Sequence, residues 1–358
     1  MMSDYISTTA YMFEAVLAAA LLTLAAGWLA IRAARRARLM DIPGSAPHKK
    51  HRYPTPLAGG IALMLALLPL AYFSGLWRQP GIGVLLVGAV VVFIFGLWDD
   101  ARKITALPKL TGQVLAALII VASGVHIQIF ESADFFIGGP DPLYLWLDRL
   151  LTIFWIVGIT NALNLVDSWD GLSVGLSAWA FGFFMLATFD SQQHDLSLLS
   201  ALLLGACLSL NYFNLSPSRL FLGDSGAQLL GFLLAAIAIL YTPTAAAQTS
   251  SWFVPILLLG VPIFDTTLVF FSRLRRGSPF YSSGSDHTFH RLVYLGFEPP
   301  RAVTIMHLAA LLLECAAFIA ASLHPVWANS VFIVCLLFGI AAVAFLETRA
   351  LPAAAAKQ

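Results

Sequence analysis

The feature that most constrains this chain is a succession of apolar stretches, each roughly 18 to 22 residues long, the length of a helix that crosses a bilayer. Only 11% of the residues are charged, against about a quarter in a soluble domain, so a water-soluble globular fold is excluded. We expect a single all-α membrane domain over 1–358 with about eleven transmembrane helices, near residues 11–31, 57–76, 81–98, 108–126, 149–166, 171–189, 196–214, 222–241, 252–271, 302–323 and 327–346.

The basic residues predict how these helices are oriented. Lys and Arg are concentrated in the cytoplasmic loops of membrane proteins. With the loops assigned alternately to the two sides, 18 of the 20 Lys and Arg residues fall on one side, and Arg78 and Arg149 fall on the other. We therefore expect the N-terminus outside and the C-terminus in the cytoplasm. A net charge of +1 leaves no basic excess for binding nucleic acid.

Two adjacent carboxylates, Asp99 and Asp100, close the third expected span. They repel each other, and the negative end of the helix dipole adds to the repulsion, so the pair needs a cation nearby. Arg102 and Lys103 would supply it if the pair is only a solvated helix end. The alternative is a functional carboxylate pair at the cytoplasmic membrane face.

A polar side chain recurs every third residue in Asn161, Asn164, Asp167 and Asp170. On a helix this spacing places side chains along one flank. Unpaired polar groups are costly in lipid, so the stripe should face protein, with a sharp turn at Gly171. It would form either a ligand site or an interhelical ladder of hydrogen bonds.

Residues 221–226, with the sequence FLGDSG, open the eighth expected span. Asp224 at a helix start is typical of an N-cap, and helix-start amides can also hold phosphate.

The segment 286–291 contains His287, His290 and Arg291, and it follows Arg273, Arg275 and Arg276 on the same predicted side. Arginine and imidazole suit phosphoryl oxygens, whereas the three earlier arginines are typical positive-inside anchors.

Three further carboxylates fall within apolar stretches. A carboxylate at position 265 is energetically costly in the membrane unless Asp265 faces the protein interior. No role is assigned to Glu14 and Glu314. The carboxylates of the predicted cytoplasmic face, together with the arginines and histidines, match Mg²⁺ and phosphate. This cation prefers one or two carboxylates plus substrate oxygens and water.

With these residues assembled, the chain resembles the polyprenyl-phosphate N-acetylhexosamine-1-phosphate transferases over about residues 41–296. The motifs that carry the resemblance lie in order at 54–60, 96–100, 161–171, 221–226, 262–265 and 286–291. Two departures, Ser168 in place of a common glycine and the absence of three consecutive histidines in 286–291, favour the branch that resembles undecaprenyl-phosphate N-acetylglucosaminyl 1-phosphate transferases over the muramoyl-pentapeptide branch.

The resemblance implies roles for ten residues. It implies Mg²⁺, or Mn²⁺, on Asp224 and Asn164, and catalysis by Asp99 and Asp100, with Asp99 acting as a base, a nucleophile or an orienting group. It also implies contacts to the UDP-sugar and the lipid phosphate by Asp167, Asp170, Phe221, His287, His290 and Arg291.

The implied reaction passes an N-acetylhexosamine 1-phosphate, N-acetylglucosamine 1-phosphate first among the candidates, from UDP to polyprenyl phosphate. It releases UMP at the cytoplasmic face of a bacterial inner membrane and begins lipid-linked polysaccharide synthesis. A polytopic secondary transporter of an anionic solute is the alternative from another class. Such a protein would show internal repeats and polar groups near the middle of the membrane.

Overall fold

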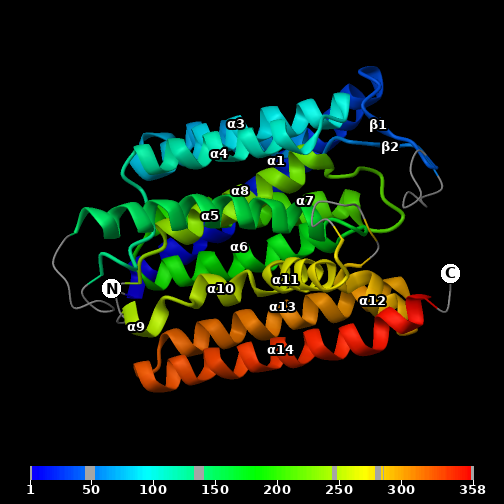
Figure 1. The fold of residues 1–358 in the computed structure, drawn as a ribbon. Coiled ribbons are helices and arrows are strands. Elements are labelled where there is room, and N and C mark those ends of the chain that lie inside the picture. Colours follow the sequence, from blue (N-terminus) through cyan, green and yellow to red (C-terminus); the bar gives the residue numbers. More distant parts are fainter. Residues whose placement is uncertain are drawn as a thin grey trace.

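In the computed structural model, long helices run side by side in one bundle (Figure 1). The structure describes residues 2–44, 53–132, 141–243, 248–278, 284 and 286–355. Eight helices in these ranges are long and apolar enough to cross a membrane. They are α1 (Met2–Arg36), α3 (Pro80–Arg102), α5 (Pro142–Val166), α6 (Leu172–Asp190), α7 (His194–Asn214), α8 (Gly223–Leu240), α13 (Pro299–Ala321) and α14 (Pro325–Ala355). The expected all-α polytopic membrane fold is confirmed.

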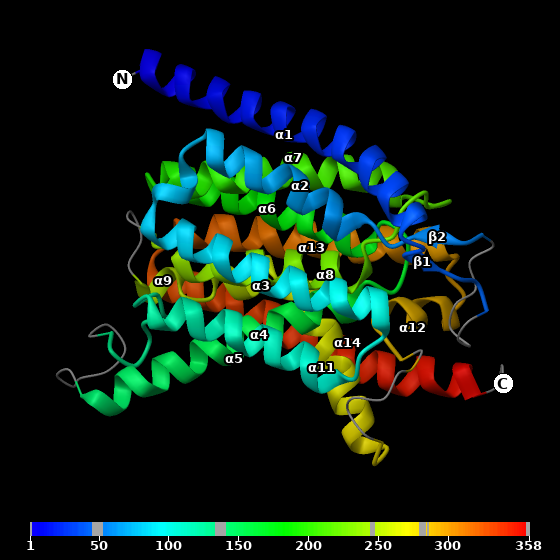
Figure 2. The ribbon, with the colours of Figure 1, turned by 90° about the horizontal axis from the view of Figure 1, so that it is seen from above.

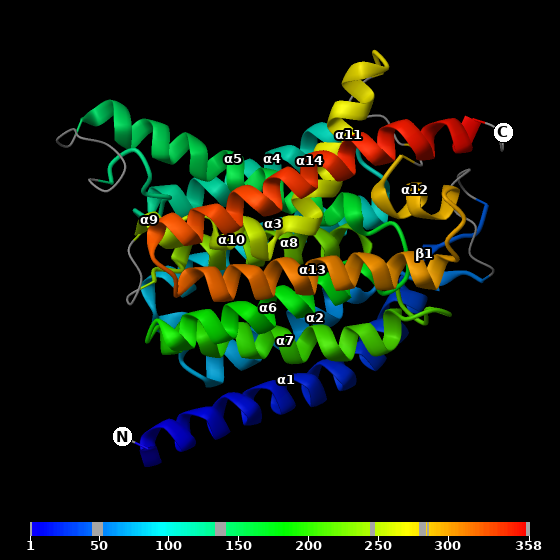
Figure 3. The same ribbon diagram turned by 90° about the horizontal axis from the view of Figure 1, so that it is seen from below.

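The other expected spans take different forms. The helices α2 (Gly59–Phe73) and α4 (Ala106–Ala122) are apolar but shorter. After the short α9 (Gln248–Ser251), the expected span near 252–271 is not one straight helix, because α10 (Val254–Leu258) and α11 (Gly260–Arg275) meet at a bend of 69°. Pro262, in the first turn of α11, has no N–H to donate to the carbonyl of Leu258, so one helical hydrogen bond across the break at Leu259 is missing. As a result, α11 projects from the bundle (Figures 2 and 3).

Helix α8 forms the centre of the bundle. It packs against α2, α3, α5 and α6, and 78% of its apolar window is buried inside the protein. Apart from Gln228, its sequence after the first turn is apolar on all sides, which is typical of a helix surrounded by other helices. By contrast, α14 has 11% of its window buried and exposes most of its apolar side chains. Polar groups at the start of α8 are therefore enclosed by protein.

Two short strands bring an early segment to the start of α8. The strands β1 (Met40–Asp41) and β2 (Thr55–Pro56) pair antiparallel, and Leu57 then forms a parallel bridge to Phe221. The carbonyl of Phe221 accepts hydrogen bonds from Ala58 N and Gly59 N, at 3.1 and 3.0 Å. The motifs at 54–60 and 221–226 are therefore neighbours in space.

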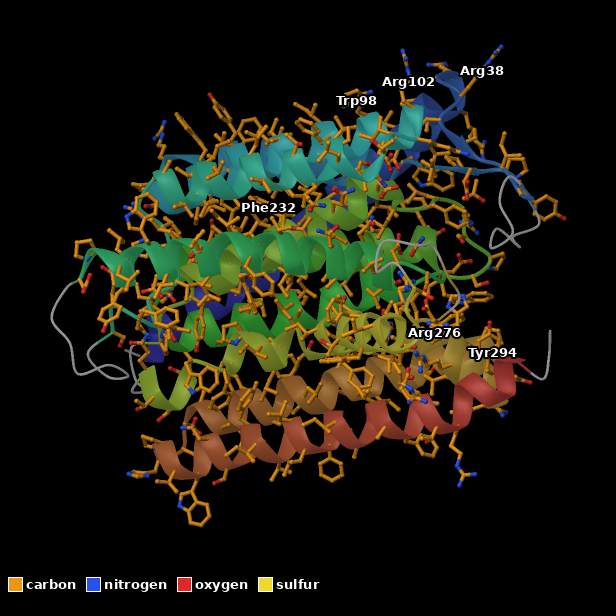
Figure 4. All side chains as sticks on the ribbon, in the orientation of Figure 1. Arg38, Trp98, Arg102, Phe232, Arg276 and Tyr294 are labelled. Atoms are coloured by element: carbon orange, nitrogen blue, oxygen red, sulfur yellow. The ribbon has the colours of Figure 1, made fainter. Side chains whose placement is uncertain are left out.

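Basic residues from distant parts of the chain gather at one end of the bundle. Arg38, Arg102 and Arg276 all lie at this end, which also carries the C-terminus, while the N-terminus lies at the opposite end (Figure 4). The helix α12 (Thr288–Tyr294) lies there as well (Figure 3). The loops that the sequence assigns to one side of the membrane thus share one end of the molecule.

Candidate active site

An ion-pair cluster joins α3, α4 and α8 at this end of the bundle. The ammonium group of Lys109 lies 2.5 Å from Asp99 Oδ2 and 3.1 Å from Asp224 Oδ1. Asp99 is buried, whereas the side chains of Asp224 and Lys109 keep 29% and 27% of their surface. The cation that Asp99 needs is therefore Lys109, and not Arg102 or Lys103, which are exposed.

The carboxylate of Asp100 makes different contacts from that of its neighbour Asp99. Its carboxylate accepts hydrogen bonds from Asp224 N (2.7 Å), Ser225 N (3.1 Å) and Ser225 Oγ (2.6 Å). These are the free amides at the start of α8, so Asp100 caps that helix from α3. The interpretation of Asp224 as the N-cap is wrong, since its own side chain faces Lys109.

Two glycines permit this close contact between α3 and α8. Gly223 has φ +70°, and a Cβ there would lie 2.5 Å from Asp100 Oδ2. A Cβ on Gly96 would lie 2.5 Å from Ser225 Cα. A side chain at either position would push the two helices apart and break the cap.

Asn164 completes the cluster around Asp224. Its side-chain NH₂ donates to Asp224 Oδ1 at 2.9 Å. The predicted stripe is only partly helical, because α5 ends at Val166 and Asp167 and Asp170 lie in the following turn. Gly171 has φ +76° and ends the sharp turn that the sequence predicts, directly before α6.

Asp167 remains close enough to sense the charge of the cluster. Its Oδ1 accepts a hydrogen bond from Ser173 Oγ at 2.6 Å. Burial, with a smaller contribution from the negative charges of Asp224 and Asp170, raises the pKa of Asp167 to about 7 against the opposing effect of this bond. The turn thus adds two carboxylates to the two that face Lys109.

Asn161 belongs to a ladder of buried amides. Its NH₂ donates to Gln113 Oε1 at 2.6 Å, and Gln113 donates in turn to Gln228 Oε1 at 3.0 Å. Gln228 lies 3.4 Å from Asp224 Oδ1. The interhelical ladder is therefore present at Asn161, and the ligand site stays a prediction, with Asn164 in a polar cluster beside Asp224.

Phe221 is half-buried at the edge of this site. Its N–H donates to Pro56 O at 2.9 Å, so its backbone is held by the last residue of β2. The implied contact of Phe221 with the UDP-sugar or the lipid phosphate stays a prediction.

The arginine and histidine segment forms a second, more buried cluster. Arg273 binds both oxygens of Asp286, at 2.8 and 3.0 Å, and Arg276 lies 2.7 Å from the same carboxylate. Burial alone would raise the pKa of Asp286, but the two guanidinium groups outweigh it and lower the pKa to about 2. The interpretation of Arg273 as a simple membrane anchor is wrong, because this side chain is buried and paired.

Asp265 faces the protein interior, as the sequence predicts, and has no exposed surface. One oxygen lies 2.8 Å from His287 Nδ1, and the other accepts a hydrogen bond from Thr288 N at 2.6 Å. Asp265 therefore fixes both His287 and the start of α12.

Arg291 is fully buried, and its contacts are structural. Its Nε donates to Asp286 O at 2.8 Å, and its Nη1 lies 2.6 Å from Glu347 Oε1 of α14. The structure does not bring this guanidinium group to the carboxylates around Lys109. The predicted contact between Arg291 and a pyrophosphate stays a prediction, and the guanidinium group is covered in this structure.

An aromatic stack connects α12 with the carboxylate turn. Trp169 stacks on Phe289 at 4.9 Å between ring centroids, and the ring of His290 lies edge-on to Phe289 at 5.3 Å. His290 is half-exposed beside this stack. The histidine segment and the turn at 167–170 therefore lie next to each other. They meet through an aromatic pair that was not among the predicted site residues.

Sequence reasoning also missed Lys109, Gln113 and Gln228. A usable signal was present, because Lys109 and Gln113 are four residues apart in one apolar stretch, as are Asp224 and Gln228 in another. Residues at this spacing share one face of a helix. Two polar faces of this kind on apolar helices predict that the helices pack against each other.

The donor set around Lys109 suits a hard cation. Among the described residues no three His, Cys, Asp or Glu side chains form a ready metal cage. Mg²⁺ does not need one, since one or two carboxylates suffice when water and phosphate complete its shell. Asp99 and Asp224 supply two carboxylates, Asn164 supplies an amide, and a single lysine leaves the cluster with excess negative charge. These residues fit the ion.

The fold and this cluster define a polytopic α-helical membrane protein with a carboxylate-rich site at one end of its bundle. The chain belongs to glycosyl transferase family 4, which matches residues 82–242. The resemblance seen in the sequence motifs is confirmed.

Curated relatives extend the match over most of the chain. It is 29% identical to a probable undecaprenyl-phosphate N-acetylglucosaminyl 1-phosphate transferase of Bacillus subtilis, over 81% of this chain and 79% of that protein. It is 30% identical to a decaprenyl-phosphate N-acetylglucosaminephosphotransferase of Mycobacterium tuberculosis, over 72% and 70%. A phospho-N-acetylmuramoyl-pentapeptide-transferase of Lactiplantibacillus plantarum is 31% identical over 58% and 68%. These relatives are named as transferases, and none of them as a transporter.

Proposed function

We propose that the protein transfers N-acetylglucosamine 1-phosphate from UDP-N-acetylglucosamine to undecaprenyl phosphate or another polyprenyl phosphate. The transfer releases UMP and starts a lipid-linked polysaccharide of the cell envelope. The observation that carries the proposal is the Asp99–Lys109–Asp224 cluster at one end of a membrane bundle. The names of two relatives that match more than two thirds of the chain support the choice of sugar and lipid.

The reaction exchanges one phosphoanhydride for another. An oxygen of the lipid phosphate bonds to the β-phosphorus of the UDP-sugar, the bond from that phosphorus to the bridging oxygen breaks, and its electron pair leaves with UMP. The second pKa of a phosphate monoester is near 6, so the acceptor is largely ionised at neutral pH. Catalysis then depends on aligning the two phosphates and reducing their repulsion.

Lys109 provides the positive charge nearest to the reacting groups in this proposal. Asp99 and Asp224 hold its ammonium group from two sides, and Asn164 fixes Asp224 in turn. Asp100 keeps the start of α8 against α3. The ion pair of Asp99 with Lys109 supports an orienting role for Asp99, and the roles of base and nucleophile are the alternatives.

Asp224 is the proposed main ligand of Mg²⁺, with Asn164 and Asp99 beside it. When bound, the ion supplies the positive charge that offsets the charge of the phosphates. The excess of carboxylates over lysine in the cluster supports this assignment.

The proposed topology has eleven spans in one domain, with its motifs in residues 41–296. The eight long helices, the bent α10–α11 pair and the shorter α2 and α4 account for these spans. The N-terminus lies outside, and the C-terminus and the site face the cytoplasm across a bacterial inner membrane. The position of the termini at opposite ends and the basic residues at the end with the C-terminus support this orientation (Figures 1 and 4).

The test is UMP release from UDP-N-acetylglucosamine by protein in lipid nanodiscs, with undecaprenyl phosphate and Mg²⁺ each added or omitted. We expect release only when both are present, and none from Asp224→Asn. A parallel panel of other UDP-N-acetylhexosamines and of UDP-N-acetylmuramoyl-pentapeptide identifies the preferred donor. Absence of UMP with every donor, together with solute uptake by proteoliposomes, would replace the proposal with the transporter alternative.

A further inference from the structure

One oxygen of the proposed metal ligand Asp224 is already surrounded by hydrogen-bond donors. Three side-chain nitrogens lie within hydrogen-bond distance of Asp224 Oδ1, namely Lys109 Nζ at 3.1 Å, Asn164 Nδ2 at 2.9 Å and Gln228 Nε2 at 3.4 Å. A carboxylate oxygen has two lone pairs, so these donors already use its capacity. A cation that binds this oxygen must therefore displace at least one of them.

Lys109 is the donor that conflicts most with a bound cation. Its ammonium group also lies 2.5 Å from Asp99 Oδ2, so it holds the second carboxylate of the cluster as well. Two positive charges a few ångströms apart repel each other, most of all where water is partly excluded. Asn164 and Gln228 are neutral, and each amide also has an oxygen that it can turn toward a cation. A divalent cation and the Lys109 ammonium group therefore compete for the same carboxylates.

The surroundings of Lys109 allow its ammonium group to leave the carboxylates. The side chain keeps 27% of its surface and lies in the first turn of α4. A lysine ammonium group is a point charge on a flexible four-carbon stem, and it binds phosphate as readily as carboxylate. The diphosphate of a UDP-sugar at this site would offer it a new anionic partner. Asp100 does not replace it at the carboxylates, because Asp100 is bound to the start of α8.

We propose that Lys109 makes the binding of a divalent cation and of the UDP-sugar interdependent. Without the UDP-sugar, the ammonium group neutralises Asp99 and Asp224 and weakens the binding of the cation. With the UDP-sugar bound, the phosphates attract the ammonium group and free both carboxylates. Such coupling is reciprocal, so the cation also raises the affinity for the UDP-sugar. This inference rests on the proposed function, which brings a diphosphate to this cluster.

The experiment measures Mn²⁺ binding to the full chain in nanodiscs of zwitterionic lipid, by the electron paramagnetic resonance signal of the free ion. Mn²⁺ takes the same oxygen ligands as Mg²⁺. Titrations are made with and without UDP, which carries the diphosphate but no sugar, and nanodiscs without protein correct for Mn²⁺ bound to UDP in solution. Polyprenyl phosphate is omitted, so the result does not depend on turnover.

Three variants accompany the wild type. Lys109→Met removes the competing ammonium group, and Asp224→Asn removes the proposed ligand. Arg102→Met is the matched control, because Arg102 is basic, close in sequence and exposed. If Lys109→Met fails to fold, Lys109→Gln removes the same charge and keeps a polar end.

Without UDP, Lys109→Met should bind Mn²⁺ about 10-fold more tightly than the wild type, because one neighbouring positive charge is gone. Arg102→Met should bind Mn²⁺ as the wild type does, and Asp224→Asn should lose the site. UDP should tighten Mn²⁺ binding to the wild type by a larger factor than to Lys109→Met, since only the wild type has an ammonium group to release.

Equal Mn²⁺ affinities of Lys109→Met and the wild type without UDP would overturn the proposal. A wild type whose Mn²⁺ affinity does not respond to UDP would overturn it as well, whatever the variants do. UMP release, measured separately, distinguishes this failure from that of the proposed function. A protein that shows the predicted affinities but releases no UMP would keep the coupling and lose the proposed reaction.

Discussion

The carboxylate and lysine cluster of α3, α4, α5 and α8 differs from the arginine and histidine cluster of α11, α12 and α14 in how its charges are balanced. In the first, Asp99 and Asp224 share one cation, and Lys109 and Asp224 remain partly exposed. In the second, Arg291 is bound to Glu347 and Arg273 to Asp286, and both guanidinium groups are buried.

This difference separates a partly exposed site that can accept a ligand from a buried set of ion pairs, in which Arg291 Nη2 still lacks a hydrogen-bond partner among the described residues. A ligand adds favourable contacts where charge is unbalanced and accessible, and it gains little where every charge has a buried partner. The first cluster therefore has the properties of the reaction site, and the second holds α12 and its histidines in place.

Removing the Lys109 side chain should have the largest effect and tests whether the first cluster is the reaction site. We expect Lys109→Met to lower UMP release by about 100-fold or more, because an electrostatic group at the reacting phosphates is lost. Arg102→Met is the matched control, since Arg102 is basic, close in sequence and exposed. It should keep close to full activity in the same assay. Equal losses in the two variants would contradict the assignment of Lys109.

Removing a charge from the second cluster should lower the stability of the protein. We expect Asp286→Asn to lower the free energy of unfolding at pH 7 by about 2 to 3 kcal/mol, because it leaves buried Arg273 without its counter-charge. Denaturant or thermal unfolding in detergent measures the change. An unchanged stability would show that Asp286 and Arg273 do not hold this segment together.

The Asp286 carboxylate should also make the stability of the protein depend on pH. Its pKa is about 2 in the folded protein and about 4 in an unfolded chain, so its stabilisation is present above pH 4 and is lost as the pH falls toward 2. The stability difference between wild type and Asp286→Asn should therefore shrink between pH 5 and pH 2. A difference that stays constant over this range would refute the linkage.

A smaller effect distinguishes the two neighbouring aspartates. Asp100→Asn should lower the free energy of unfolding by about 1 kcal/mol, because it weakens the cap on α8. Asp99→Asn removes no cap and should change activity more than stability. Unfolding curves and UMP release of both variants, measured side by side, test this division. The opposite pattern would exchange the two roles.

The smallest predicted effect concerns the amide ladder. Gln113→Leu removes the hydrogen bonds to Asn161 and Gln228, and interhelical bonds of this kind contribute about 0.6 kcal/mol on average in membranes. Thermal unfolding should show a decrease in the free energy of unfolding of this size. A loss as large as that of Asp286→Asn would show that the ladder supports the site more than the geometry indicates.

The spans and the gathering of polar motifs at one end could be predicted from sequence, because lipid imposes long apolar helices and basic residues mark one side. The break at Leu259 was harder to predict, since residues 252–271 are mostly apolar and hydropathy does not register the N–H that Pro262 lacks. The stripe at 161–170 was predicted as one flank, but α5 ends at Val166 and leaves Asp167 and Asp170 in a turn.

The sequence did not predict which charged side chains pair with each other in the fold. Lys109 counts as an ordinary loop cation until the fold places it beside Asp224, 115 residues away. Arg291 looked available for a phosphate because its partner Glu347 lies in α14, outside the motifs. Pairing between distant helices depends on packing, which local patterns do not encode.

The most direct test of the account compares UMP release by Asp224→Asn and Asp286→Asn, at a temperature where both variants and the wild type are folded. The account predicts that folded Asp224→Asn loses at least about 99% of the activity, because an unbalanced ligand-binding carboxylate is gone. It predicts that folded Asp286→Asn keeps most of its activity. An active Asp224→Asn together with an inactive, folded Asp286→Asn would contradict the account and move the reaction site to the arginine and histidine segment.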